Sequence, residues 1–328
     1  MFVRRSLPHV SQSGLVAVVK HAKTHGLDEL PISRKGWFVA RNVSLGDTPY
    51  GPMLVEVTLT AIPPHANRKM LVINPFAYLH VAYGQAGGFY NMVAKKMRDT
   101  QCSHEAPWRL IMYSDEVVPG NVLRIANARK VWVICWSFLE LHPFLSMEES
   151  WVPMIAEPSV ELKHISGGIS QVFAKCVAVF FGALQFDFSS GGIQLTGPDG
   201  NRVQLYADLD MLLQDGGAHK LVWGCKGDGG TRVCMLCGNL VATKSGIADE
   251  NGDDMLVCSH VQADECRLST DAEILASVDR IALLRTTESN ANFQRWQQAI
   301  GFVDEPHGLL RDLSVRSHIR PSSQYAHD

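Results

Sequence analysis

The feature that most constrains the fold of this chain is a pair of cysteines two residues apart, Cys234 and Cys237. A two-residue spacer lets both thiolates reach one tetrahedral zinc ion, and the remaining ligands then come from nearby in the chain. Cys258 is the expected third ligand. The fourth position is open between His260, Cys225 and Cys266. The spacing predicts a structural Zn²⁺ site, a zinc knuckle within residues 221–268.

Loops rich in glycine and acidic residues fill the same stretch, at 227–230 (GDGG) and 248–254 (ADENGDD). Such loops bury little apolar surface, so a bound metal would be needed to hold them in a folded conformation. A catalytic zinc would need an open coordination position beside an acid or base, and the sequence singles out none. The alternative is a cluster of reduced cysteines that binds no metal.

Composition restricts the class of protein. The 328 residues are 46% hydrophobic, enough for a substantial core in a folded, soluble protein. A formal net charge of −3 gives no global basic field, so any nucleic-acid contact must be local. The longest apolar stretch, 172–184, contains Lys175 and is too short to span a membrane, and no signal peptide is evident. Eight cysteines in a chain of this length indicate a reducing compartment.

Apolar runs between residues 108 and 156 predict three successive strands, an antiparallel meander whose first strand ends at Asp115. Apolar residues at spacings of three and four predict a helix over 168–181. A hairpin follows around Asp199–Gly200, and then an apolar run that ends at Asp215. This order indicates an α/β fold, a ribonuclease-H-like mixed sheet with flanking helices and a zinc-knuckle insertion.

Acids at the ends of neighbouring strands can meet in space although Asp115 and Asp215 are about 100 residues apart. Two such carboxylates suit Mg²⁺, which prefers oxygen ligands and can promote phosphodiester chemistry. The simpler alternative for each residue is a turn former or a helix cap. Asp208 and Asp210 compete with Asp215 for the same role.

Five segments carry a family resemblance through their order: 113–121 (YSDEVVPGN), 129–141 (RKVWVICWSFLEL), 213–220 (LQDGGAHK), 226–237 (KGDGGTRVCMLC) and 301–312 (GFVDEPHGLLRD). Together they resemble cut-and-paste DNA transposases with an acidic triad, and most closely the zinc-bearing eukaryotic branch that includes the Kyakuja, Dileera and Zisupton elements. The resemblance runs from about residue 106 to the end of the sequence.

The resemblance assigns the first catalytic acid, in a Tyr-x-Asp context, to Asp115. It assigns the second acid, in Asp-x-x-Ala shortly before Cys-x-x-Cys, to Asp215 rather than Asp208. An Asp-x-x-His element and a third acid, commonly Glu, should come next, and this sequence stops at Asp328. If Asp328 begins that element, the catalytic set of this chain is incomplete.

The resemblance therefore implies a transposase-derived, nuclear protein whose ancestral activity is Mg²⁺-dependent cleavage and transfer of DNA strands, inactive as this chain. DNA is the expected partner, and a homo-oligomer is possible, whereas neither a membrane nor a small-molecule substrate is indicated. One alternative is a catalytically dead, zinc-stabilised protein that binds nucleic acid or protein. Another is a fragment without a function of its own.

Four regions result from this interpretation. Residues 1–105 form an N-terminal module of unassigned role, and 106–220 form the ribonuclease-H-like core with its first two acids. The zinc knuckle occupies 221–268. Residues 269–328 form a helical C-terminal segment that leaves the core incomplete, with helices expected at 271–284, capped by Ser269 or Thr270, and at 291–300.

Overall fold

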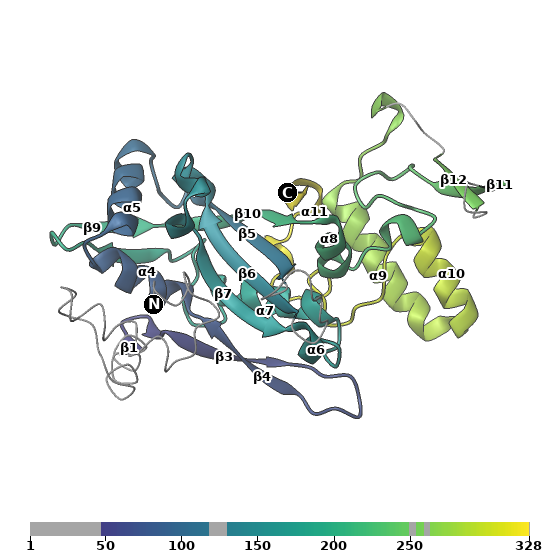
Figure 1. Ribbon diagram of the computed structural model, residues 1–328, viewed down its shortest axis with the longest axis horizontal. Coiled ribbons are helices and arrows are strands. Elements are labelled where there is room, and N and C mark those ends of the chain that lie inside the picture. The colour runs from purple at the N-terminus through teal and green to yellow at the C-terminus, as the bar shows by residue number, and fades with distance from the viewer. Residues whose placement is uncertain (1–46, 118–129, 249–253, 259–262, 328) are drawn as a thin grey trace, which may run out of the picture.

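The computed structural model describes residues 47–117, 130–248, 254–258 and 263–327. Its centre is a five-stranded mixed sheet with helices packed around it (Figure 1). Across the sheet the strands follow the order β13-β10-β5-β6-β7. They span Tyr325–His327 (β13), Ala207–Gln214 (β10), Trp108–Val117 (β5), Val131–Phe138 (β6) and Val152–Pro158 (β7). The predicted mixed α/β architecture is confirmed in this form.

The meander expected between residues 108 and 156 is present, because β5 pairs antiparallel with β6 and β6 with β7. Strand β10 lies parallel to β5 on its other side, and β13 lies parallel to β10. One boundary differs from the prediction. Asp115 lies within β5 rather than at its end, because pairing with β6 continues as far as Val117 opposite Val131.

Helix α7 (Gly168–Phe180) connects β7 towards β10 and confirms the predicted crossover helix. It is buried on nearly every side, which is why apolar residues occupy more than one face. Phe180 packs edge-on against Trp136 of β6, with ring centroids 5.3 Å apart. Helix α8 (Gly216–Trp223) follows β10 and packs on α7 through Ser170, whose Oγ donates to the carbonyl of Val222.

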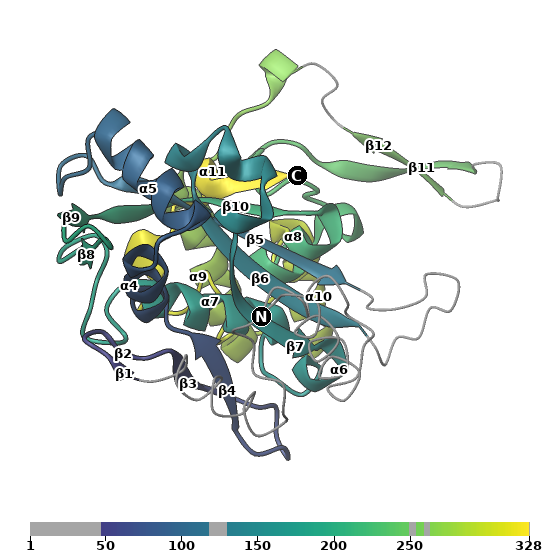
Figure 2. The same ribbon diagram turned by 60° about the vertical axis from the view of Figure 1, so that its left-hand side comes forward.

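An N-terminal layer borders the sheet (Figures 1 and 2). Its elements are β1 (Asp47–Thr48), β2 (Gly51–Pro52), β3 (Leu54–Leu59), β4 (Arg68–Ile73), α4 (Pro75–Gly84), α5 (Gly88–Asp99) and the hairpin of β8 (Ile193–Thr196) and β9 (Arg202–Leu205). The β3–β4 hairpin lies beside β7, and helices α4 and α5 lie at one end of the sheet. The ring of Phe76 in α4 stacks on that of Phe188, with centroids 4.2 Å apart, and the ring centroids of Phe188 and Phe180 are 5.8 Å apart. These aromatic contacts make the layer part of one continuous core.

The C-terminal region begins with a helical hairpin of α9 (Asp271–Thr287) and α10 (Asn290–Ile300), close to the predicted helices. Thr270, one of the two expected caps, is the N-cap of α9 and forms a capping box with Glu273. The chain then returns to the core, where the Leu309 N–H donates to Ser170 Oγ at 2.9 Å. It ends through α11 (Pro321–Gln324) and β13.

Between α8 and α9, strands β11 (Ala242–Ala248) and β12 (Asp254–Cys258) form a ribbon that projects from the body (Figure 2). The short helices are α6 (Ser159–Leu162) and the 3₁₀ turns at Leu139–Leu141, Phe144–Ser146, Glu148–Ser150, Gly227–Gly229, Ala263–Glu265 and Arg316–His318. None of the helices in the described part of the chain combines the length and apolar character that crossing a membrane requires.

Candidate acidic site and thiol cluster

The register between β5 and β10 brings the two predicted magnesium ligands together. Ser114 pairs with Gln214 in the last rung that joins these parallel strands. Asp115 and Asp215 are the next residues, and the backbone of Asp215 is still extended. Because neighbouring strands lie about 4.8 Å apart and matched positions share a face, the two acids occupy adjacent backbone positions at this end of the strands.

Asp115 is half-buried and is oriented by its own strand. The hydroxyl of Tyr113, two residues earlier on the same face, donates to Asp115 Oδ2 at 3.3 Å. The Tyr113 ring in turn packs edge-on against Trp151, with centroids 6.3 Å apart. The hydrogen bond from Tyr113 orients one oxygen of the Asp115 carboxylate and leaves the other oxygen for a further partner.

Asp215 is exposed and is the N-cap of α8. Its Oδ1 accepts a hydrogen bond of 2.6 Å from the Ala218 N–H. The helix-cap interpretation of this residue is therefore correct as a description of its local role. A cap uses one carboxylate oxygen, so Oδ2 remains able to bind a cation.

The two competing acids of β10 lie elsewhere. Asp208 pairs with Arg109 near the start of both strands, six residues before Gln214, which is roughly 20 Å along a strand. Asp210 falls in the irregularity between Leu209 and Met211. Neither residue reaches the edge where Asp115 stands, so position alone favours Asp215 as its neighbour.

One acid adjacent to the site, Glu116, was not singled out by the sequence analysis. It follows Asp115 on β5 and therefore points to the opposite face of the sheet. Lys130 Nζ lies 2.7 Å from Glu116 Oε2. Burial acts to raise the pKa of Glu116, but Lys130, together with Ser159 and Lys163, outweighs burial and holds the pKa below its ordinary value. Glu116 is thus a structural ion-pair partner.

The third parallel strand, β13, pairs with β10, and side chains before it add hydrogen bonds to the same strand. Arg320 Nη2 and Gln324 Nε2 each donate to the carbonyl oxygen of Leu209 at 2.7 Å. The ring of His219 stacks on Tyr325 with centroids 4.1 Å apart. Gln214 of β10 pairs with His327 on this side. Asp328, which follows, lies outside the described residues.

The predicted zinc ligands fall into two groups. Cys234, Cys237 and Cys266 are described and close together. Burial raises the pKa of the Cys237 thiol to about 12, and its interactions with the Cys234 and Cys266 thiols contribute to the rise. The side chain of Cys258 and the whole of His260 lie outside the described residues, so their part in a zinc site stays a prediction.

Cys225, the other alternative ligand, is buried beside the cluster. Its Sγ lies 3.9 Å from the carbonyl oxygen of His219, and burial raises its pKa to about 11. Among the residues that the structure describes, no three His, Cys, Asp or Glu side chains form a ready metal-binding group. The donor chemistry of the three neighbouring thiols nevertheless fits zinc, which prefers thiolate ligands.

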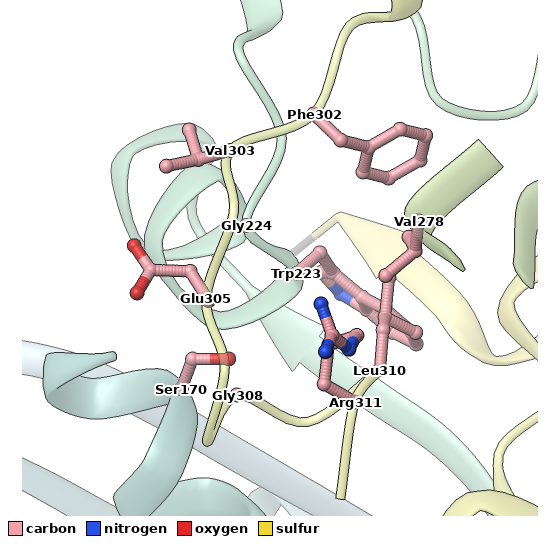
Figure 3. Close-up of a pocket in the computed structure, with 10 residues that line it drawn as sticks. All are labelled: Ser170, Trp223, Gly224, Val278, Phe302, Val303, Glu305, Gly308, Leu310 and Arg311. Carbon is pink, nitrogen blue, oxygen red and sulfur yellow. The ribbon is translucent and has the colours of Figure 1, made fainter. Parts of the chain in front are cut away.

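A small cavity lies apart from the acids, between the C-terminal end of α8 and the returning segment 302–311 (Figure 3). Its volume of about 10 Å³ has room for one water molecule. The Arg311 guanidinium lines it, while the Glu305 carboxylate points to the other side of the segment in Figure 3. The cavity is too small to be a substrate pocket.

Comparison with known proteins assigns no family to this arrangement. No protein-family model matches the chain, and no curated protein matches it.

Proposed function

We propose that this chain is a transposase-derived protein with a ribonuclease-H-like core, in which Asp115 and Asp215 bind Mg²⁺ and whose ancestral activity is cleavage and transfer of DNA strands. The observation that carries the proposal is the Ser114–Gln214 pairing, which sets these two acids side by side on adjacent parallel strands. They come from sequence positions about 100 residues apart.

Strand order supports the proposal. Numbered in chain order within the sheet, the strands β5, β6, β7, β10 and β13 stand in the spatial order 3-2-1-4-5. The first three form the antiparallel meander, and the last two run parallel to the first. This is the arrangement expected of a ribonuclease-H-like core, and it matches the order of segments on which the family resemblance rests.

Charge gives the second support. Neither Asp115 nor Asp215 forms an ion pair with any residue that the structure describes. Two neighbouring carboxylates without a counter-charge repel each other, so a cation bound between them would relieve the repulsion. Mg²⁺ is commonly held by one or two carboxylates together with water and substrate phosphates, which suits an exposed pair.

The chain's own groups would orient the carboxylates for this role. Tyr113 holds one oxygen of Asp115, and the Ala218 N–H holds one oxygen of Asp215. The remaining oxygens would bind the cation. Bound magnesium would supply positive charge there, favouring attack by water or a DNA 3′-hydroxyl on phosphorus. The third acid implied by the resemblance is not assigned to a described residue.

Isothermal titration calorimetry of Mg²⁺ into metal-free protein tests the site. We expect measurable binding to the wild type and loss of binding in Asp115→Asn and Asp215→Asn. Asp208→Asn is the matched control, because it removes the same charge from the same strand roughly 20 Å away. Wild-type protein that binds no magnesium, or site variants that bind magnesium as tightly as the wild type, would overturn the proposal.

Cleavage of DNA in Mg²⁺ tests the reaction. The incomplete acidic set predicts that the chain has lost the ancestral reaction; any cleavage that it retains should be abolished by Asp115→Ala and by Asp215→Ala, and cleavage that survives both substitutions would contradict the role of these acids. DNA affinity that falls steeply with salt but is unchanged in both variants, without cleavage, would favour the catalytically inactive binding protein instead.

We also propose that Cys234 and Cys237 bind a structural zinc ion with Cys266, since the three thiols are already neighbours. Zinc would close the segment between α8 and α9, including the base of the β11–β12 ribbon. Tyr325 lies close enough to the thiols of Cys225 and Cys234 for their charge to contribute to its raised pKa, after burial. The zinc segment therefore borders β13, the strand next to β10.

A further inference from the structure

The two residues that precede the acids, Ser114 and Gln214, form a buried polar pair. Both side chains are 0% exposed. They lie opposite each other on β5 and β10. Because side chains alternate along a strand, they point away from Asp115 and Asp215. They share the face of the sheet on which Trp136, paired with Met112 in the ladder, contacts Phe180 of α7. They cannot themselves be ligands of a metal held by the acids.

Three polar atoms of this pair have no hydrogen-bond partner among the described residues: Ser114 Oγ, Gln214 Nε2 and Gln214 Oε1. Leaving a buried polar group unsatisfied costs about 1–3 kcal/mol of stability, so three such atoms on one rung are costly. Apolar side chains of similar size would avoid this cost. Elsewhere in the sheet a buried serine is satisfied, since Ser137 Oγ donates to the Ser150 carbonyl at 2.7 Å.

We propose that Ser114 and Gln214 bind one internal water molecule and that this unit positions Asp115 and Asp215. The hydroxyl and the amide supply both donors and acceptors, which is what a buried water with two to four partners needs. A water shared between the strands would tie the last rung of the β5–β10 ladder. Asp115 and Asp215 directly follow Ser114 and Gln214, so the distance between the two carboxylates depends on how firmly this last pair is held.

This inference rests on the proposed magnesium site for its functional part, and on the buried atoms alone for the water. In metal sites, the groups that hold the ligands commonly change metal affinity by 10–100-fold when they are removed. Ser114 and Gln214 would act in this way, as positioning residues that touch neither metal nor substrate.

The experiment uses Ser114→Ala, Gln214→Met and the double variant, with Ser137→Ala as control. Calorimetry at a temperature where every variant is folded should show Mg²⁺ binding weakened about tenfold in each single variant. Ser137→Ala should keep wild-type affinity, although it also removes a buried hydroxyl from the sheet. A high-resolution crystal structure should show a water within hydrogen-bond distance of both side chains.

Thermal unfolding separates the water from the magnesium. If the water is present, each single variant removes one of its hydrogen-bond partners and should have a lower melting temperature than the wild type. The melting temperature of the double variant should fall by less than the sum of the two single decreases. If no water is bound to Ser114 and Gln214 and the variants have higher melting temperatures than the wild type, the inference is overturned. Unchanged magnesium affinity in both single variants would also overturn it. If the wild type binds no magnesium, the proposed function fails, and crystallography and unfolding still decide the water site.

Discussion

The carboxylate of Asp215 caps helix α8 by accepting a hydrogen bond of 2.6 Å from the Ala218 N–H. The same side chain is the proposed partner of Asp115 in binding a cation. Helix capping requires only a side-chain acceptor, whereas cation binding requires the negative charge. The two roles can therefore be separated by substitution.

Asp215→Asn should keep the cap and lose the cation, because asparagine caps helices about as well as aspartate. Asp215→Ala should lose both, and its free energy of unfolding should fall by about 1 kcal/mol. Urea denaturation of metal-free protein measures the difference between the two variants. Equal stability of the Asn and Ala variants would show that the hydrogen bond to Ala218 contributes nothing.

Asp115→Asn should raise the melting temperature of the metal-free protein. The substitution removes one of two neighbouring charges that no described residue neutralises. Magnesium should then stabilise the wild type by binding only the folded state, and should leave the melting temperature of Asp115→Asn unchanged. Thermal unfolding with EDTA and with Mg²⁺ gives both comparisons, and a lower melting temperature of the variant in EDTA would contradict the repulsion.

Zinc content should depend on Cys266 as strongly as on Cys237, because both thiols lie in the same cluster. Elemental analysis of purified protein should give about one zinc per chain, and Cys237→Ser and Cys266→Ser should each lower it. Cys176→Ser is the control, since Cys176 is buried in α7. Full zinc occupancy in Cys266→Ser would remove Cys266 from the ligand set.

Lys175 of α7 and Asp312 of the returning segment should stabilise the fold as a pair. Their Nζ and Oδ2 atoms are 2.7 Å apart, and the side chains are 31% and 13% exposed. Lys175→Met leaves a mostly buried carboxylate without its cation and should lower the free energy of unfolding by about 1–2 kcal/mol. Adding Asp312→Asn should recover part of the loss, and a double-mutant cycle with no coupling energy would contradict this.

The stability of α9 should depend on acid pH through Glu273. The Thr270 N–H, followed by Arg267, lowers the pKa of this carboxyl from 4.5 to about 2. A carboxyl with a lowered pKa in the folded state contributes stability above its unfolded pKa and loses it as pH falls towards the folded value. Between pH 4.5 and 2, unfolding measurements should therefore show a shallower pH dependence for Glu273→Gln than for the wild type.

Local patterns in the sequence were sufficient for the individual elements. Continuous apolar runs located β5, β6 and β7, and apolar residues at spacings of three and four located α7, α9 and α10, because a buried helix face repeats with the helix geometry. The end of β5 was misplaced at Asp115, because strand pairing with β6 rather than composition sets that boundary.

The sequence by itself determined the meander, the crossover helix, the two C-terminal helices and the Cys234–Cys237 spacing. The resemblance preferred Asp215 to Asp208, but only the tertiary structure decided that Asp215 follows the rung beside Asp115, because that position depends on the β5–β10 register. The tertiary structure also placed Cys266 against Cys237 and left Ser114 and Gln214 buried without described partners. These relationships join residues far apart in the chain, and their energies depend on strand pairing and desolvation, which no local pattern encodes.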